Sequence, residues 1–126
     1  MEITIFDGRG HPVAYIADDD ENSIYLWSGH AVVYIVSENV YGWNGHHLGW
    51  FIDGVVYDIH GRKVGSIQGK CPYATYAEHA KYAKYAKYAK YAKYAAYARP
   101  ALSLSYSDES LEDFLKQGAV GNVGGK

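Results

Sequence analysis

The stretch VYGWNGHHLGWF, residues 40–51, decides the fold. Its centre, Asn44-Gly45, is the strongest short signal for a two-residue type I′ hairpin turn, because both central residues of that turn need a positive φ. Aromatic and β-branched residues, which favour strands, lie on both sides of the turn. The stretch therefore predicts a short antiparallel β-hairpin.

The same pattern occurs four times in the first 70 residues. Each copy has a glycine with an aliphatic residue five positions before it, an aromatic residue four before it, and large apolar residues three and six after it. The glycines are Gly10, Gly29, Gly45 and Gly61. Two-residue turns would pair the aromatic with the residue three after the glycine, as in Tyr41 with Leu48, and would place Asp58 against Lys63.

A single hairpin cannot bury a face in water, whereas four similar hairpins packed around a pseudo-fourfold axis can. The residue four after the glycine is small in three of the copies, Ala14, Gly49 and Gly65, as a crowded axis requires. We therefore expect residues 1–70 to form a closed four-hairpin β domain. An open meander of eight strands is the alternative.

Residues 73–99 read as nine uninterrupted triplets, YAT, YAE, HAK, four YAK, YAA and YAR, followed by Pro100. A three-residue register fits polyproline II or a 3₁₀ helix, while the helix propensities of Ala and Lys favour an α-helix. We expect residues 71–100 to form a rod, with polyproline II favoured over the two helices. As polyproline II, the 27 residues of the triplets would be about 84 Å long and would either project or fold back.

Either threefold form gives the rod three parallel stripes, of tyrosine, of alanine and mostly of lysine. We expect the tyrosine or alanine stripe to lie against a partner while the lysines stay in solvent. Residues 1–72 hold nine acidic and four basic residues, a net charge of −5, and residues 73–99 hold six basic residues and one acidic, a net charge of +5. An acidic body and a basic rod attract each other, within one chain or between chains.

Residues 101–126 form a third segment. Residues 101–106 alternate like a short strand, and Ser107 is a good N-cap for a short helix whose apolar face contains Leu111, Phe114 and Leu115 and which ends at Gly118. The glycine-rich end after this helix should be flexible.

Few residues suggest chemistry. His11, His30 and His46 each follow a turn glycine and should lie far apart at the hairpin tips, so we expect no metal site. No catalytic constellation and no cofactor motif is present. The start of the chain has no apolar leader, no long apolar run occurs, and Cys71 is the only cysteine, so we expect a cytoplasmic protein that does not enter a membrane.

The chain resembles the bacterial four-fold β-flower proteins, a family of unknown function. The resemblance rests on the Tyr25-Leu26-Trp27 strand, on residues 40–51, on the tyrosine triplets and on the tail from Leu104 to Leu115. The resemblance implies a mainly β fold and does not indicate an activity or catalytic residues. Here alanine follows tyrosine and lysine comes third, whereas relatives tend to place lysine directly after tyrosine.

The sequence thus predicts a non-enzymatic assembly or interaction module in which the rod mediates self-association or docking, so that a homo-oligomer is expected. The alternative is binding of a polyanion or single-stranded nucleic acid by the lysine and tyrosine stripes. The candidate docking residues of the rod are Tyr82, Lys84, Tyr85, Lys87, Tyr88, Lys90, Tyr91, Lys93 and Tyr94. Trp27, Trp43 and Trp50 form a candidate aromatic platform, with core packing as the alternative.

Overall fold

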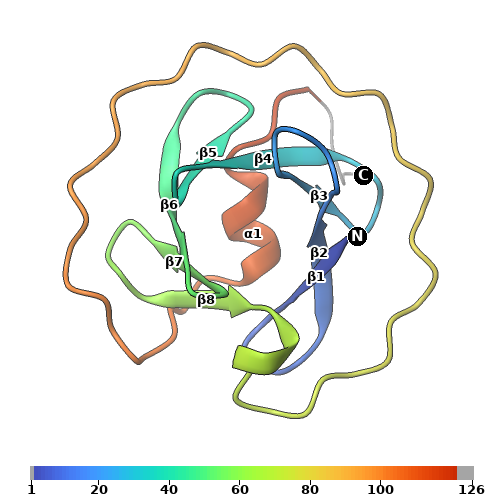
Figure 1. Ribbon diagram of the computed structural model, residues 1–126, viewed down its shortest axis with the longest axis vertical. Helices are drawn as coiled ribbons and strands as arrows, with labels where there is room; N and C mark the ends of the chain where they lie inside the picture. The colour runs from blue at the N-terminus through green and yellow to red at the C-terminus, as the bar shows by residue number, and fades with distance from the viewer. Residues whose placement is uncertain (1, 122–126) are drawn as a thin grey trace.

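Eight antiparallel strands close into a barrel in the computed structural model, which describes residues 2–121 (Figure 1). The strands are β1 (Ile3–Phe6), β2 (Pro12–Ile16), β3 (Ser23–Leu26), β4 (Ala31–Val36), β5 (Asn39–Gly42), β6 (His47–Ile52), β7 (Val55–Asp58) and β8 (Lys63–Ser66). Each strand pairs with its neighbours in sequence, and Phe6 of β1 pairs with Ser66 of β8 to close the ring. The closed four-hairpin arrangement is confirmed, and the open meander is not formed.

The turns within the hairpins differ from the two-residue turn that the sequence predicted. In each hairpin the glycine N–H donates to the carbonyl three residues before it, as Gly45 does to Gly42, and only the glycine has a positive φ. This is a three-residue loop with a glycine bulge. Type I′ turns instead join successive hairpins at Ser37-Glu38 and Asp53-Gly54, where both central residues have positive φ.

The bulge shifts the register by one residue, so the predicted cross-strand pairs are wrong. Tyr41 pairs with His47 rather than Leu48, and Tyr57 rather than Asp58 pairs with Lys63. Because side chains alternate along a strand, the extra residue turns Leu48 and its three counterparts to the barrel interior. Two of the aromatic residues four before the glycine, Tyr25 and Tyr41, join a second cluster instead.

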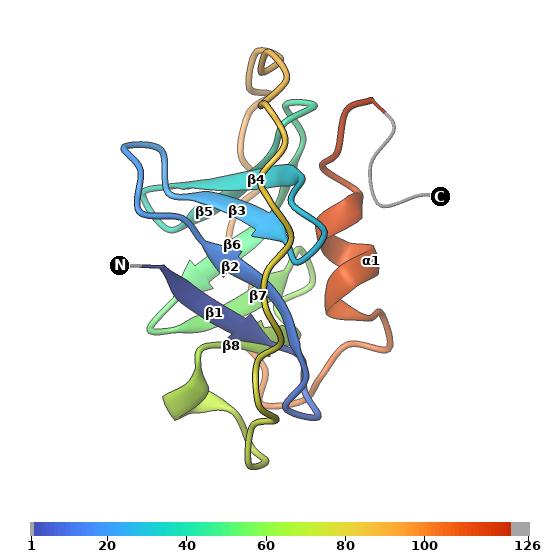
Figure 2. The ribbon, with the colours of Figure 1, turned by 90° about the vertical axis from the view of Figure 1, so that its right-hand side faces the viewer.

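A short helix, α1 (Leu111–Lys116), covers one end of the barrel (Figure 2). Leu111, Phe114 and Leu115 pack into the interior cluster of the strands and are no more than 1% exposed. The helix begins later than predicted, because its N-cap is Ser110. The N–H of Ser107 donates instead to the Lys63 carbonyl, so Ser107 belongs to the edge of the barrel.

The tail before the helix forms less β structure than the sequence suggested. Tyr106 makes only an isolated parallel bridge with Lys63, and residues 101–105 belong to no strand. Helix α1 ends before Gly118, as predicted, with the Gly118 N–H donating to the Leu115 carbonyl. Much of the predicted flexible end, residues 122–126, lies outside the described residues.

The triplet segment folds back on the barrel. A short 3₁₀ turn, η1 (Gln68–Lys70), leads into the belt, the name used from here for residues 73–103, which runs once around the outside of the barrel (Figure 1). Residues 74–103 belong to no helix and no strand. The α-helical and 3₁₀ alternatives are thus not assigned there, and polyproline II stays a prediction. In the described part of the chain no helix is long and apolar enough to span a bilayer.

Candidate functional site: the belt

The belt is attached to the hairpin tips at regular intervals of nine residues. The N–H groups of Tyr76, Tyr85, Tyr94 and Ser103 donate to the carbonyls of the four turn glycines, Gly10, Gly29, Gly45 and Gly61, over 2.8–2.9 Å. Three triplets therefore span one hairpin. Belt and barrel share one fourfold repeat, although the barrel unit is sixteen or nineteen residues long and the belt unit is nine.

A histidine follows three of the four turn glycines and contacts the belt as well. The rings of His11 and His30 stack on Tyr76 and Tyr85, with centroids 4.4 and 4.2 Å apart, and the His46 ring packs at a tilt against Tyr94, with centroids 5.0 Å apart. These histidines do lie at separate tips, but each is a packing partner of a belt tyrosine. No group of three or more ligating side chains that could hold a metal is found among residues 2–121.

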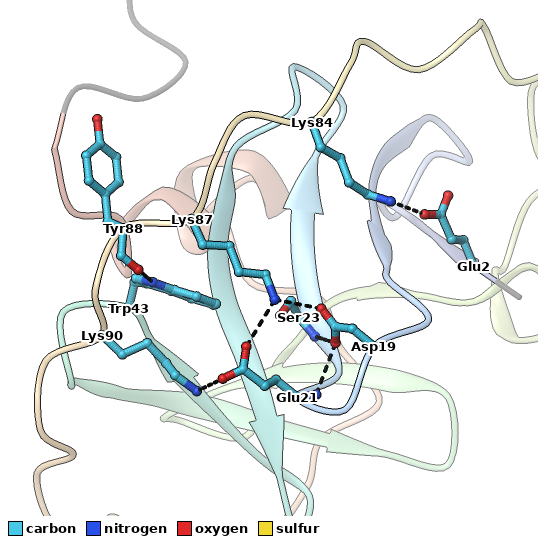
Figure 3. A network of polar contacts seen from close by, with 9 residues as sticks. All are labelled: Glu2, Asp19, Glu21, Ser23, Trp43, Lys84, Lys87, Tyr88 and Lys90. Carbon is cyan, nitrogen blue, oxygen red and sulfur yellow. Dashed lines mark hydrogen bonds and ion pairs between the residues drawn. The ribbon is translucent and has the colours of Figure 1, made fainter.

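The belt cations face the barrel. Lys84 Nζ lies 2.6 Å from Glu2, Lys87 Nζ lies 2.8 Å from Asp19, and Lys90 pairs with Glu21 (Figure 3). Lys81 also pairs with Glu2, and Arg99 pairs with Glu38. The lysine stripe was expected to stay in solvent. These side chains instead pair with carboxylates of the barrel while Lys84, Lys87 and Lys90 keep 45%, 30% and 30% of their side-chain surface exposed.

The ion pairs repeat with the same nine-residue period. Lys81, Lys90 and Arg99 pair with Glu2, Glu21 and Glu38, which stand eight, eight and seven residues before the glycines of successive hairpins. At the fourth place Asp53 pairs with Lys70 of η1, with Nζ 3.1 Å from the carboxylate. The opposite charges of body and belt are therefore matched within one chain.

The ammonium groups of the belt lysines also lie over aromatic rings of the barrel. Lys81 Nζ lies 4.6 Å from the ring centre of Tyr15, and Lys90 Nζ lies 4.1 Å from that of Tyr34. Lys93, which has no ion pair among the interactions described, lies 6.0 Å from the ring centre of Tyr41. An ammonium group over a ring face contributes about 0.5–1 kcal/mol at an exposed site.

The ion pairs lower the pKa values of the carboxylates that hold the belt. Burial alone would raise the pKa of Asp19, but hydrogen bonds from Lys87 and Ser23 outweigh it and lower the pKa to about 2. Hydrogen bonds from Lys84 lower the pKa of Glu2, and hydrogen bonds from Lys90 and Lys87 lower that of Glu21. All three groups therefore favour the folded, belted state when they are ionised.

Replacing Lys87 with Met should make the stability of the protein less dependent on acid pH. Because the pKa of Asp19 is depressed in the folded state, its contribution is present above the unfolded value of 3.8 and is lost as the pH falls through about 2. After allowance for solvent screening we expect Lys87→Met to cost about 1 kcal/mol at neutral pH, and less as the pH falls towards 2.

Urea unfolding of both proteins between pH 7 and pH 2 measures this difference. Lys116→Met is the matched control, because the ion pair of Lys116 is with Glu112 inside α1 rather than between belt and barrel. A Lys87→Met difference that stayed constant over this pH range would contradict the role of Asp19.

The Tyr88 ring points away from the barrel in Figure 3. Other belt tyrosines are also largely exposed, although Tyr76, Tyr85 and Tyr94 contact the histidines at the hairpin tips. The eight side chains, called the tyrosine rim from here, are 50–70% exposed. They are Tyr73, Tyr76, Tyr82, Tyr85, Tyr88, Tyr91, Tyr94 and Tyr97. Because lysine and tyrosine alternate around the same threefold register, turning the lysines inward leaves the tyrosines outside.

The three tryptophans contact different partners. Trp27 packs edge-on against Tyr15, Trp43 against Tyr34, and Trp50 against His47. Trp43 and Trp50 are 1% and 4% exposed, and the Trp43 indole N–H donates to the Tyr88 carbonyl under the belt. Two of the tryptophans that the sequence grouped as a platform, Trp27 and Trp43, thus lie beneath belt lysines, and Trp50 packs against His47.

Sequence reasoning missed the acidic residues that position the belt. Glu2, Glu21 and Glu38 stand before successive hairpins, and the sequence signal for them is their place before each hairpin together with the opposite charge of the belt. The residues assigned to docking are brought together on one segment, but on opposite sides of it. Lysines bind the barrel, and tyrosines meet solvent.

Comparison with known proteins identifies a family whose model the chain matches. Residues 3–115 match the model of a family described as 4-fold beta flower protein, so the match includes the barrel, the belt and most of α1. No curated protein and no solved structure matches the chain.

Proposed function

The chain belongs to the 4-fold β-flower protein family, and from this premise we propose that it is a non-enzymatic assembly module whose tyrosine rim binds the rim of a second copy. The observation that carries the proposal is the row of eight tyrosines, each at least half exposed, around the circumference. Large exposed apolar surfaces on a protein commonly mark sites of protein–protein interaction.

The attachment of the belt supports this role. The backbone of Tyr76, Tyr85 and Tyr94 is hydrogen-bonded to the barrel, so their rings are held outward before any partner arrives. Tyrosine also loses little side-chain entropy on binding and offers a hydroxyl at its outer end, which makes it frequent in interfaces. Docking between pre-organised rings therefore costs less than docking of a loose rod.

Charge favours a second copy over a polyanion. Lys81, Lys84, Lys87, Lys90 and Arg99 already pair with carboxylates of the barrel. Two rims can approach without strong repulsion, whereas a nucleic acid would have to compete for these lysines with the chain's own acidic groups.

The three-residue register also supports polyproline II in the belt. The single cysteine is compatible with a reducing cytoplasm.

Replacing Tyr82, Tyr85, Tyr88 and Tyr91 together with serine should abolish self-association. We expect the unchanged protein to associate in a concentration-dependent manner in sedimentation equilibrium and the variant to stay monomeric, because four adjacent contact rings are lost. The matched control replaces the neighbouring Ala83, Ala86, Ala89 and Ala92 with serine, which keeps every tyrosine.

A monomeric unchanged protein at all concentrations would overturn the proposal. Binding of the monomer to a fluorescent single-stranded oligonucleotide at about 0.15 M salt, lost as salt increases, would favour the polyanion alternative instead.

A further inference from the structure

The belt has a second series of backbone hydrogen bonds, which stops before the fourth hairpin. The N–H groups of Tyr82 and Tyr91 donate to the carbonyls of Trp27 and Trp43, which stand two residues before their turn glycines. Nine residues further along the belt stands Pro100, which has no N–H to donate, so the series cannot continue. The last interval of the belt is therefore held by other contacts.

A histidine side chain holds the belt in this interval. The Tyr97 N–H donates to Nδ1 of His47 over 3.0 Å. The other N–H groups of the described belt that bind the barrel donate to backbone carbonyls. The remaining hairpins have no side-chain acceptor at the place of His47, where they carry Pro12, Ala31 and Lys63. A carbonyl accepts at any pH, whereas an imidazole nitrogen accepts only while it carries no proton, so the attachment of Tyr97 depends on pH.

The His47 ring is buried in its neutral form. It is 4% exposed and contacts the rings of Tyr41, Trp50 and Tyr97, with centroids 5.2, 4.9 and 5.8 Å away. Burial lowers the pKa of His47 below its ordinary value of 6.5, and the Gly49 backbone, which acts in the opposite direction, does not offset this effect. Because Nδ1 accepts from Tyr97, the proton of the neutral ring is on the buried Nε2.

A proton on Nδ1 removes this attachment. The nitrogen then becomes a donor that faces the N–H donor of Tyr97, and two donors cannot form a hydrogen bond. The belt N–H groups bonded to the barrel on either side are those of Tyr94 and Ser103. Of the ion pairs in the described chain, the residues between them keep one, in which Arg99 lies 3.7 Å from Glu38 with both side chains exposed. Such a pair contributes little, so this part of the belt comes loose.

Charged groups beside His47 favour its protonated form. Asp58 of β7 and Glu109 of the tail line the same cavity of about 410 Å³. Both carboxylates already accept hydrogen bonds within the chain, and no ion pair joins either to the neutral ring in the described structure. Their negative charge nevertheless stabilises a positive charge nearby. The other titratable groups of the lining, besides Tyr97, are His46 and His60, which oppose that charge when they are protonated.

We propose that His47 is a pH-sensitive latch of the belt, which holds Tyr97 while Nδ1 carries no proton and releases residues 95–102 when Nδ1 is protonated. Since the pKa of the latched ring is depressed, the released belt binds the proton more readily. The latch is therefore closed above about pH 6.5 and opens as the pH falls through the pKa of the latched ring. It acts within one chain and is independent of self-association.

NMR spectroscopy of the full-length protein between about pH 8 and about pH 4.5 tests the latch. The Hε1 resonance of His47 reports its protonation, and the amide proton resonance of Tyr97 reports its hydrogen bond. We expect both to change with one midpoint below pH 6.5, and the Tyr97 amide to move to the position of a solvated amide. The amides of Tyr82 and Tyr91 bind backbone carbonyls and should not follow this midpoint.

Two variants test the residue. His47→Asn places a side-chain oxygen close to the position of Nδ1, and this oxygen accepts at any pH. We expect the Tyr97 amide of this variant to stay hydrogen-bonded and to lose its pH response. His60→Asn is the matched control, because His60 lines the same cavity without a side-chain bond to the belt in the described chain, and it should keep the response.

A Tyr97 amide that does not follow the protonation of His47 in the unchanged protein would overturn the proposal, and this result requires no variant to fold. A pH response that persists in His47→Asn, or that disappears in His60→Asn, would contradict it as well, because another group would then control the belt.

Discussion

Replacing Gly29 with Ala should destabilise the protein by about 2–4 kcal/mol and loosen the belt beside the second hairpin. Gly29 has a φ of +103°, and a Cβ atom there would lie 2.2 Å from the Ala83 carbonyl oxygen. Alanine would therefore combine backbone strain with displacement of the belt. The displaced belt would also lose the hydrogen bond from the Tyr85 N–H to the Gly29 carbonyl.

Urea unfolding measures the loss of stability, and hydrogen exchange of the Tyr85 amide reports the local loosening. Gly69→Ala is the matched control, since a Cβ at Gly69 has no neighbour within 4 Å and its φ is not positive. We expect the control to change stability by less than about 0.5 kcal/mol. Equal effects of the two substitutions would show that the belt does not press on the turn.

Replacing Phe114 with Ala should cost about 3–5 kcal/mol, the range for removing a large buried aromatic side chain. Phe114 is 1% exposed and belongs to the interior cluster of the barrel, so its removal leaves a cavity between α1 and the strands. The measurement is the free energy of unfolding in urea. Lys116→Ala on the same helix removes only an exposed ion pair and should cost below about 1 kcal/mol.

A cost for Phe114→Ala as small as that of Lys116→Ala would mean that α1 covers the barrel without supporting it. The two proteins would then also show equal amide protection in the strands.

The sequence predicted the barrel well because its signals are local. Four glycines with the same apolar neighbours indicate four hairpins, and the pattern requires closure to bury its apolar face. The turn type was less predictable. Asn44-Gly45 is typical of a type I′ turn, but the structure uses that turn at Asp53-Gly54, which carries an equally strong signal. Both pairs fit either turn, and the strand register that distinguishes them depends on packing.

For the helix and the candidate site, too, the sequence predicted one part correctly and missed another. Leu111, Phe114 and Leu115 were predicted as one apolar face, yet the start of the helix moved from Ser107 to Ser110. Both serines are good caps, and the choice depends on the bond between the Ser107 N–H and the barrel. The cavity beside His47 could not be predicted, since its lining comes from two hairpins, the belt and the tail.

By itself, the sequence determined the number of hairpins, the threefold register of the belt and the opposite charges of body and belt. Only the tertiary structure decided which stripe of the belt faces the barrel. A three-residue register makes the tyrosine, alanine and lysine stripes equivalent in the isolated segment, so local chemistry cannot choose among them. The choice is made by Glu2, Asp19 and Glu21, which the closed barrel places beneath the path of the belt.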